Sequence, residues 1–468
     1  MTTTTEGPGT RTLESLGRVH FIGIGGVGMS AVARIMVARG VPVTGSDAKD
    51  LPVMADLAAA GAGISVGYSA GNLGAAQTVV AGSAIRADNP ELAAAHAAGL
   101  PVLHRSEALA ATMAQDRVVT VAGTHGKSTT TSMIAVLLRG AGLDPSFAIG
   151  ANVPALGVNA ASGTSNVFVA EADESDGSFL NYRPHIAVVT NVEPDHLDYY
   201  GTADAVYASF DRFTELLPAD GVLVACADDA GALALAGRTA ARGNTRVVLY
   251  GTAGDAQLRL HDGGPGDVWV DTPAGGRYAL QLQVPGRHNA LNAAAAFAVA
   301  LELGVAPEAA SAALSHFSGA SRRFEFKGEG RGVRVYDDYA HHPTEVRAAL
   351  AAARSVAGNR KVHVLFQPHL FSRTREFAGE FAEALNTADT ALVLDIYPAR
   401  EDPIPGVSSK LIGDHLSAGG RLVSASDAVR AIVADAAPGD IVLTAGAGDV
   451  TAYGPLIVEA LAAEAPGD

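Results

Sequence analysis

A short glycine turn carries a lysine and a serine directly after an apolar run. Residues 123–128 read Gly-Thr-His-Gly-Lys-Ser and follow the valine-rich stretch 118–122, which has the composition of a buried strand. A turn that then continues as a helix presents backbone N–H groups and the positive end of the helix dipole to a phosphate group. Lys127 can neutralise that phosphate, and the hydroxyl of Ser128 can hold Mg²⁺. The chain is therefore predicted to be an enzyme that consumes a nucleotide.

The surroundings of this turn decide between two interpretations. The strict phosphate-loop pattern has a glycine where this chain has Val121, so the turn is a shorter variant. The alternative is a surface turn with a solvated lysine. The predicted strand before the turn and the helix start rich in threonine and serine after it favour the phosphate loop.

Glu171 and His196 follow the next two predicted strands of this region. Glu171 stands at the end of strand 167–170, and His196 closes the motif Asn-Val-Glu-Pro-Asp-His after strand 187–190. Ligands of open α/β sheets bind at the carboxyl ends of the strands, so both residues are expected near the lysine turn. The Ser128 hydroxyl and a Glu171 carboxylate oxygen are ligands that Mg²⁺ prefers, whereas His196 either coordinates the ion or lies behind its ligands.

Glu171 opens the acidic run Glu-Ala-Asp-Glu-Ser-Asp, which leaves two interpretations for Asp173, Glu174 and Asp176. These three acids can belong to the metal site, or they can complement the dipole of a helix that starts there. The helix-start interpretation is preferred for these three residues.

A second glycine motif lies near the N-terminus. Gly23, Gly25 and Gly28 form G-x-G-x-x-G after the predicted strand 19–22, and Asp47 follows nineteen residues after Gly28. This spacing is typical of a dinucleotide-binding turn, so a nicotinamide-dependent dehydrogenase is a rival hypothesis. The same turn can hold the diphosphate of a nucleotide sugar, which is favoured over both a dinucleotide and a purely structural turn.

Polar residues also gather at predicted strand ends in the last third of the chain. Asp338, Tyr339 and His341 lie between a predicted strand and a predicted helix, where core packing is a poor explanation for this set. Arg373 follows the next predicted strand and is suited to grip a carboxylate.

Two asparagines and an arginine precede that region. Asn289 and Asn292 lie three residues apart at a predicted helix start and can share a face, with helix capping as the alternative for Asn289. Arg323 follows a turn and is suited to contact a phosphate or a carboxylate.

Strands alternate with helices along the whole chain, which indicates parallel, doubly wound sheets. A chain of 468 residues is expected to form about three domains. The stretch 251–285 is predicted to be an antiparallel β excursion, and 290–305 a buried helix. The predicted boundaries are a disordered lead at 1–17, a first domain at 18–112, a central domain at 113–318 and a C-terminal domain at 319–468.

Composition limits the compartment and the partners. The formal net charge of −16 argues against nucleic acid or an anionic membrane as a general partner. Cys226 is the one cysteine, so disulfides are excluded and a reducing compartment is indicated. The polar N-terminus lacks the apolar core of a signal peptide, and no apolar run is long enough to span a bilayer. A cytoplasmic location without membrane insertion is expected.

The motifs together resemble those of the Mur ligase family over nearly the whole chain. That family has a Rossmann-like UDP-binding domain, a central P-loop-type ATPase domain with a mostly parallel sheet, and a Rossmann-like C-terminal domain that brings the amino acid. The resemblance thus implies an α/β fold with three domains. It rests on the order and spacing of HFIGIGGVGMS at 20–30, GTHGKSTT at 123–130, EADESD at 171–176, TNVEPDH at 190–196, GRHNALN at 286–292, RRFE at 322–325 and DDYAHHP at 337–343.

The resemblance implies an ATP-dependent ligase of peptidoglycan synthesis. ATP would phosphorylate the lactyl carboxylate of UDP-N-acetylmuramate, and the amine of L-alanine would attack the acyl phosphate to form an amide. The implied cofactors are ATP and Mg²⁺, with Mn²⁺ as a substitute, and a monomer or a homodimer is expected. The alternative is a ligase that attaches a preformed peptide to the same nucleotide sugar during cell-wall recycling. A nucleotide-gated binding module is disfavoured, because three strand-end clusters point to one cleft.

The resemblance also implies roles for individual residues. The implied catalytic residues are Lys127, Glu171, His196 and His341, and the implied metal ligands are Ser128, Glu171 and His196. ATP would be bound by Gly123, Thr124, His125, Gly126, Lys127, Ser128, Thr129, Asn289, Asn292, Arg323 and Asp338. The substrates would be bound by Gly23, Gly25, Gly26, Gly28, Asp47, Ser83, Tyr339, His341 and Arg373. Leu370 stands where many relatives carry an arginine, so one cation at the amino-acid end is missing or supplied elsewhere.

Overall fold

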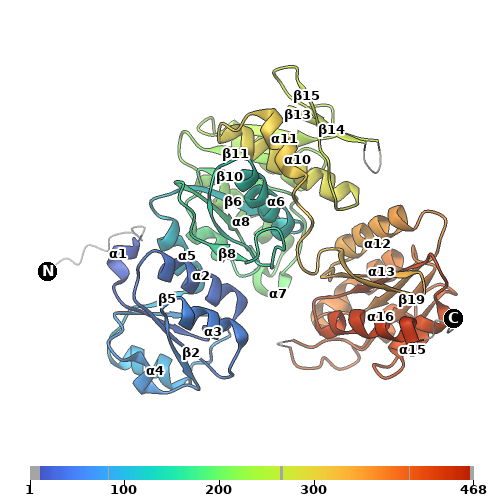
Figure 1. Cartoon of the computed structure of the whole chain (residues 1–468), viewed down its shortest axis with the longest axis horizontal. Helices are drawn as coiled ribbons and strands as arrows, with labels where there is room; N and C mark the ends of the chain where they lie inside the picture. Colours follow the sequence, from blue (N-terminus) through green and yellow to red (C-terminus); the bar gives the residue numbers. More distant parts are fainter. Residues whose placement is uncertain (1–10, 83, 264–266, 400, 464–468) are drawn as a thin grey trace. The chain divides into compact units, whose positions relative to one another are not determined.

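The computed structural model describes residues 11–82, 84–263, 267–399 and 401–463 (Figure 1). The chain divides into two compact units. Unit 1 comprises the chain up to His261 together with Trp269–Gln281 and Leu291–Phe317. Unit 2 comprises Asp262–Val268, Leu282–Ala290 and the chain from Ser318 onward.

Unit 1 begins with a five-stranded parallel sheet in the order β3-β2-β1-β4-β5. β1 lies between β2 and β4, so the strand order reverses at its carboxyl end, where such sheets bind ligands. The strands are β1 (Val19–Ile22), β2 (Val43–Asp47), β3 (Gly63–Val66), β4 (Thr78–Ala81) and β5 (Val102–His104). The helices are α1 (Leu13–Leu16), α2 (Val27–Ala38), α3 (Pro52–Ala59), η1 (Ala70–Leu73), α4 (Pro90–Ala97) and α5 (Arg105–Met113).

The stretch predicted as a disordered lead differs from that prediction at residues 13–16, which form α1. Leu16 is only 1% exposed, and its carbonyl oxygen accepts a hydrogen bond of 2.8 Å from the hydroxyl of Thr78. Burial of one leucine against the first sheet thus orders the short helix.

The second sheet of unit 1 has ten strands in the order β15-β14-β13-β12-β11-β10-β6-β9-β7-β8. The predicted antiparallel excursion is present at β14 and β15, whereas β13 pairs parallel with β12. The strands are β6 (Arg117–Ala122), β7 (Ser146–Ala148), β8 (Ala160–Ala161), β9 (Val167–Glu171), β10 (Ile186–Val189), β11 (Val222–Cys226), β12 (Arg246–Gly251), β13 (Leu258–Asp262), β14 (Val268–Asp271) and β15 (Arg277–Ala279). Its helices are α6 (Lys127–Gly140), η2 (Ser178–Asn181), α7 (Leu197–Tyr200), α8 (Ala203–Glu215), α9 (Ala230–Ala241), α10 (Arg287–Glu302) and α11 (Pro307–Leu314). The first turn of α10, up to Ala290, is counted with unit 2 and the rest with unit 1.

The centre of this sheet positions the strand ends singled out in the sequence. β6 pairs in parallel with β10 on one side and with β9 on the other. The valines of these strands are buried, as expected for a parallel sheet covered on both faces. The turn after β6 therefore lies between the ends of β9 and β10. The predicted buried helix at 290–305 is confirmed by α10, whose alanines are almost fully buried.

Unit 2 holds a six-stranded sheet in the order β16-β17-β21-β18-β19-β20, with only β16 and β17 antiparallel among the described strand pairs. One core cluster joins the sheet to α12 and α13, and another joins it to α15 and α16, so helices cover both faces (Figure 1). The strands are β16 (Glu325–Gly330), β17 (Val333–Asp338), β18 (Val362–Phe366), β19 (Thr390–Val393), β20 (Gly420–Leu422) and β21 (Ile441–Ala445). The helices are α12 (Pro343–Ala357), α13 (Phe371–Leu385), α14 (Lys410–Gly413), α15 (Ala428–Asp435), η3 (Asp449–Ala452) and α16 (Tyr453–Ala463).

The predicted α/β class with mostly parallel sheets is confirmed. The three sheets fall within the three predicted residue ranges, while the domain boundaries themselves stay a prediction. In the part of the chain that the structure describes, every helix is too short or too polar to cross a bilayer.

Candidate active site

The turn between β6 and α6 is shaped by two glycines in the left-handed region. Gly123 has a φ of 136° and Gly126 a φ of 83°, conformations that side chains disfavour. A Cβ atom at Gly123 would overlap the hydroxyl of Thr190, and one at Gly126 would lie 2.9 Å from Oδ1 of Asn292. The turn is therefore packed closely on both sides, and Asn292 lies beside it as the sequence predicts.

Lys127 lies over this turn and is paired with a carboxylate. Its Nζ atom donates to the carbonyl oxygens of Gly123 at 2.8 Å and Thr124 at 3.2 Å, and it lies 2.8 Å from Oε2 of Glu174. Burial opposes the positive charge, but the carboxylates of Glu174 and Asp173 outweigh burial and raise the pKa of Lys127. The side chain therefore carries its charge and is already held beside the loop.

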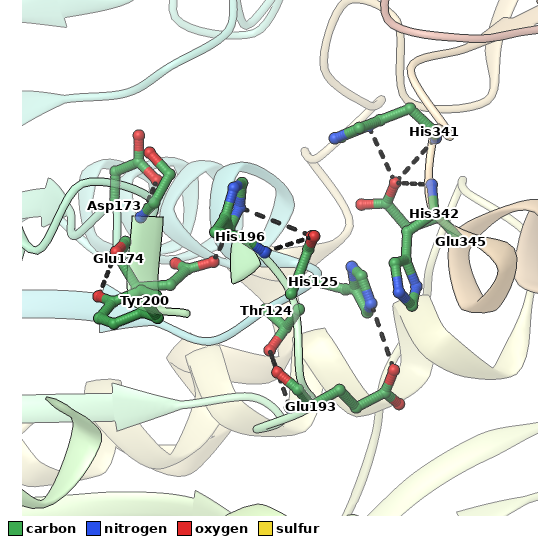
Figure 2. A network of polar contacts seen from close by, with 12 residues as sticks. Thr124, His125, Asp173, Glu174, Glu193, His196, Tyr200, His341, His342 and Glu345 are labelled. Atoms are coloured by element: carbon green, nitrogen blue, oxygen red, sulfur yellow. Dashed lines mark hydrogen bonds and ion pairs between the residues drawn. The ribbon is translucent and has the colours of Figure 1, made fainter. Parts of the chain in front are cut away.

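Glu174 makes a contact that the sequence analysis did not favour, because its carboxylate pairs with Lys127. Its side chain is 2% exposed, and the hydroxyl of Tyr200 donates to its backbone oxygen at 2.5 Å (Figure 2). Burial raises the pKa of Glu174 to about 7, although Lys127 opposes the shift. The helix-start interpretation holds for Asp176, whose Oδ1 accepts from the N–H of Ser178 at 3.0 Å where η2 begins. It is wrong for Glu174, which pairs with the lysine of the loop.

Ser128 and Glu171, two of the predicted metal ligands, lie together. Ser128 Oγ donates to Oε1 of Glu171 at 2.9 Å, and Oε2 accepts from the N–H of Gly150 at 2.8 Å. Neighbouring ligands of an octahedral Mg²⁺ ion, each at about 2.1 Å, are separated by about 3 Å. A hydroxyl and a carboxylate oxygen at this spacing fit two such positions, so this pair is chemically and geometrically suited to Mg²⁺.

His196, the third predicted ligand, has other carboxylates as its neighbours. Its Nε2 atom lies 3.6 Å from Oδ2 of Asp195 and 3.8 Å from Oε1 of Glu174. The backbone of His196 is left-handed, with a φ of 55°. These contacts place His196 beside the partner of Lys127, and its role as a metal ligand stays a prediction.

The N-terminal glycine motif forms a turn at the carboxyl end of β1, with Gly26 as the cap of α2. The N–H of Gly25 donates to Oδ2 of Asp47 at 3.0 Å, so the turn itself fixes the carboxylate at the end of β2. Gly23 has a φ of 80°. Ser83, also predicted at this site, lies outside the described residues.

Arg105, which the sequence analysis did not single out, crosses the third glycine of the motif. A Cβ atom on Gly28 would lie 2.8 Å from Cδ and 3.1 Å from Cζ of Arg105. The guanidinium group therefore lies over the first turn of α2, at the positive end of that helix. Within the described residues Arg105 forms no ion pair with a carboxylate. A cation in this position is unfavourable by itself and becomes favourable when an anion binds between it and the helix.

Unit 2 brings several predicted residues together at the end of β17. The two carboxylate oxygens of Asp338 accept from the N–H groups of Phe324 and Ala340, both at 2.8 Å. Burial raises the pKa of Asp338 to about 6, against the attraction of Arg323. The Arg323 guanidinium lies 5.0 Å from the ring centre of Tyr339. These three predicted residues thus form one polar cluster.

His341 belongs to a row of rings in the same unit. Its ring contacts those of Tyr339 and His369 edge-on, with centres 5.2 Å and 5.9 Å apart. Its Nδ1 atom lies 3.1 Å from the carboxylate of Glu345, which also accepts from the backbone N–H of His341 (Figure 2). The ring is therefore held in one orientation at the start of α12.

Arg373 and Asn289, also predicted as site residues, are both buried in unit 2. Arg373 is 7% exposed and lies in the first turn of α13, after Leu370, whose φ of 70° turns the chain into that helix. Asn289 is 5% exposed, and its Nδ2 atom donates to the carbonyl oxygen of Pro285 at 2.6 Å. Because α10 begins at Arg287, the capping alternative for Asn289 is wrong.

Comparisons with known proteins agree with this geometry. Three family models match the chain: "Mur ligase family, catalytic domain" over residues 18–117, "Mur ligase middle domain" over 121–300 and "Mur ligase, glutamate ligase domain" over 322–448. The chain is 89% identical over 467 residues to the UDP-N-acetylmuramate–L-alanine ligase of Arthrobacter sp. (strain FB24), covering 100% of both chains. It is 80% identical over 449 residues to the ligase of the same name from Paenarthrobacter aurescens (strain TC1), covering 96% of this chain and 98% of the relative.

Solved structures similar to the chain include an alanine ligase and a murein peptide ligase. The UDP-N-acetylmuramate–alanine ligase of Thermotoga maritima superposes with a TM-score of 0.76 at 29% identity, covering 95% of this chain and 98% of that one. A murein peptide ligase from Psychrobacter arcticus superposes with a TM-score of 0.70 at 26% identity, covering 95% and 99%.

Proposed function

The chain belongs to the Mur ligase family, and from that premise we propose that it joins L-alanine to the lactyl carboxylate of UDP-N-acetylmuramate, with cleavage of ATP to ADP and phosphate. The observation that carries this proposal is the 89% identity over the whole chain to a UDP-N-acetylmuramate–L-alanine ligase. The product would be an amide bond in a peptidoglycan precursor. An acid–amino-acid ligase of this kind is ATP-dependent, as Mur ligases are.

The chemistry requires two anions to meet, because the lactyl carboxylate must attack the γ-phosphate of ATP. Lys127 would lie against the β- and γ-phosphates and offset the charge that develops on them, a major source of catalysis in phosphoryl transfer. Ser128 and Glu171 would hold Mg²⁺, or Mn²⁺ in its place, and the ion when bound neutralises further phosphate charge. The 2.9 Å contact between their oxygens supports this assignment.

The remaining predicted residues are assigned from the resemblance to the Mur ligase family. We assign the glycine turn after β1, Gly26 and Asp47 included, to the nucleotide part of the sugar substrate. Asn289, Asn292, Arg323 and Asp338 are assigned to ATP. Tyr339, His341 and Arg373 are assigned to L-alanine, where the arginine would bind the amino-acid carboxylate. A monomer or homodimer in the cytoplasm is the expectation that accompanies this function.

An acceptor panel tests the function. The protein is incubated with ATP and UDP-N-acetylmuramate plus L-alanine, glycine, L-serine or a cell-wall tripeptide, and products are identified by mass. ADP and phosphate should appear only when both the nucleotide sugar and an acceptor are present, with L-alanine the preferred acceptor. ATP consumption at the same rate without L-alanine would contradict a ligase, and preference for the tripeptide would indicate a recycling enzyme.

Arg105 provides a test of the nucleotide-sugar end. We expect Arg105→Ala to raise the KM for UDP-N-acetylmuramate about 10- to 100-fold, the effect of losing charge-assisted hydrogen bonds. The KM for ATP should stay within about twofold. The control is Arg34→Ala. Arg34 belongs to α2, the helix whose first turn lies under Arg105, and its guanidinium group is 3.9 Å from the carboxylate of Asp56 in a weak ion pair. An unchanged KM for the nucleotide sugar would show that Arg105 does not bind its diphosphate.

A further inference from the structure

The loop that follows β10 runs along the phosphate loop after the strands have ended. The ladder between β6 and β10 is extended by a bond of 3.1 Å from the N–H of Thr190 to the oxygen of Ala122. One step further, the N–H of Thr124 donates to the oxygen of Asn191 at 3.1 Å. Residues 190–193, here called the β10 loop, thus continue the pairing beside residues 122–125.

Asn191 hydrogen-bonds to both backbone polar groups of one residue in the phosphate loop, His125. Its Oδ1 atom accepts from the N–H of His125 at 2.7 Å, and its Nδ2 atom donates to the oxygen of the same residue at 3.0 Å. The hydroxyl of Thr190 donates to that oxygen as well, at 2.6 Å. The side-chain amide of Asn191 therefore makes the two backbone hydrogen bonds that a neighbouring strand would otherwise make to His125.

Thr124 is held in the same way by the backbone of Glu193. Its hydroxyl accepts from the N–H of Glu193 at 2.9 Å and donates to the oxygen of Glu193 at 3.2 Å (Figure 2). The side chain of Glu193 in turn lies 3.5 Å from Nε2 of His125. Both residues between the two glycines of the phosphate loop are thus bonded to the β10 loop.

The β10 loop is itself anchored from the other side. The N–H of Val192 donates to Oδ1 of Asp229 at 3.0 Å, and the same oxygen accepts from the N–H of Ala232 at 2.7 Å, capping α9. A Cβ atom on Gly231 would overlap the carbonyl oxygen of Val192. Asn191 therefore projects from a loop that α9 holds in place, so its amide can transmit that rigidity to the phosphate loop.

These bonds divide the donors of the phosphate loop into two sets. The N–H groups of Thr124 and His125 are used by the β10 loop, whereas the ammonium group of Lys127, which contacts Glu174 in this structure, would be offered to phosphate. Donors that are fixed before a ligand arrives bind it more tightly, because no ordering cost remains to be met.

We propose that Asn191 is a positioning residue for the phosphates of ATP, acting through the backbone of His125. By holding the N–H and the carbonyl oxygen of His125, Asn191 sets the path of the loop into Gly126 and Lys127 before the nucleotide binds. This inference rests on the proposed function for the identity of the ligand, but it concerns only how the phosphate loop is shaped.

Asn191→Ala separates this role from general stability. We expect its affinity for ADP to fall about 10- to 100-fold, the loss expected for two hydrogen bonds, with adenosine affinity unchanged. The KM for ATP should rise by a similar factor, with the KM for UDP-N-acetylmuramate unaffected. In hydrogen exchange without nucleotide, the amide of His125 should be protected in the wild type and exposed in the variant.

Unit 2 offers a matched control for this substitution. The side-chain amide of Asn386 also bonds to backbone through both of its polar atoms. Its Oδ1 atom accepts from the N–H of Ser417 at 2.8 Å, and its Nδ2 atom donates to the oxygen of His415 at 3.1 Å. Asn386→Ala should shift the thermal midpoint as Asn191→Ala does, while binding ADP normally. Thr190→Val, which removes the hydroxyl's bond of 2.6 Å to the His125 oxygen and its longer contact of 3.3 Å with the Ala122 oxygen, should weaken ADP binding about threefold to tenfold and serves if Asn191→Ala does not fold.

Two results would overturn the proposal. ADP affinity within twofold of the wild type in both Asn191→Ala and Thr190→Val would exclude a positioning role. Equal losses of ADP and adenosine affinity would indicate damage to the whole nucleotide site instead. The binding measurements need no amino-acid acceptor, so failure of the acceptor panel would leave them interpretable.

Discussion

Lys127→Ala lowers kcat by at least about 100-fold, as expected when a major charge-stabilising group is lost from phosphoryl transfer. In the resting protein the Nζ atom already lies beside the loop, 2.8 Å from the oxygen of Gly123 and 2.8 Å from a carboxylate oxygen of Glu174. When ATP binds, its phosphates would compete with Glu174 for this cation. Turnover is measured with ATP, UDP-N-acetylmuramate and L-alanine at saturation, so that the effect on kcat is separated from effects on KM.

The same substitution has a stability effect whose sign follows from Glu174. Without Lys127 the buried carboxyl group loses its partner, so its pKa rises above the value of about 7 that burial already imposes. When folding raises the pKa of a carboxyl group, the folded protein is most stable where that group is protonated in both states. This contribution to the free energy of unfolding is lost as the pH rises above the unfolded pKa and through the folded pKa. The thermal midpoint of Lys127→Ala should therefore approach that of the wild type at pH 6 and fall below it at pH 8.

Lys410→Ala is the control for both effects. Lys410 is exposed, and among the described residues its ion pair is with Asp414 one helical turn away, an arrangement that contributes little to stability. It should leave both kcat and the pH dependence of unfolding unchanged. Near-normal turnover in Lys127→Ala would mean that this loop is not where ATP reacts.

The positions in the candidate site that could be predicted from the sequence are those that depend on local structure. A strand, a glycine turn and a helix start lie within a dozen residues of each other, so the position of Lys127 and Ser128 follows from the pattern alone. Glu171 could be placed at the same edge because parallel strands end at one edge of a sheet. The 2.9 Å contact between Ser128 and Glu171 is consistent with that expectation.

The parts that the sequence could not predict depend on where a loop goes after its strand ends. Glu174 lies three residues beyond β9, and nothing in the acidic run says which member reaches Lys127. Arg105 and Gly28 are far apart in sequence, and only the packed structure shows the arginine crossing the glycine. In the sequence Asn191 cannot be distinguished from an ordinary loop residue. Its two hydrogen bonds go to the backbone N–H and oxygen of His125, and nearly every residue type has these same groups.

The strand order explains why these missed residues matter. Alternating strands and helices indicate a parallel sheet but leave open which strand lies beside which. With β6 between β9 and β10, the loop after each neighbour reaches the phosphate loop from its own side. The β9 side supplies Glu171 and Glu174, whose carboxylates contact Ser128 and Lys127. The β10 side supplies Asn191 and Glu193, which hydrogen-bond to the backbone of His125 and the side chain of Thr124. The β9 flank thus contacts the cation of the loop, and the β10 flank holds the loop in place.

Glu171→Gln should lower kcat by about 100-fold and raise the Mg²⁺ concentration needed for half-maximal activity at least about tenfold. The glutamine side chain is the same size and can still accept from the N–H of Gly150, so the fold around β9 should be kept. What changes is charge, because an amide oxygen is a weaker ligand for Mg²⁺ than a carboxylate. Activity is measured across a Mg²⁺ titration at fixed ATP, with the thermal midpoint recorded without metal.

Glu302→Gln is the matched control for that titration. Glu302 belongs to the same unit and pairs with Arg246 on the surface, far along the chain from the loop. Its loss should leave the Mg²⁺ dependence unchanged. If Glu171→Gln also kept the wild-type Mg²⁺ dependence while losing activity, the carboxylate would act on the reacting groups directly rather than through the ion. The Ser128 hydroxyl would then need another explanation, because its hydrogen bond to Glu171 would not mark a metal site.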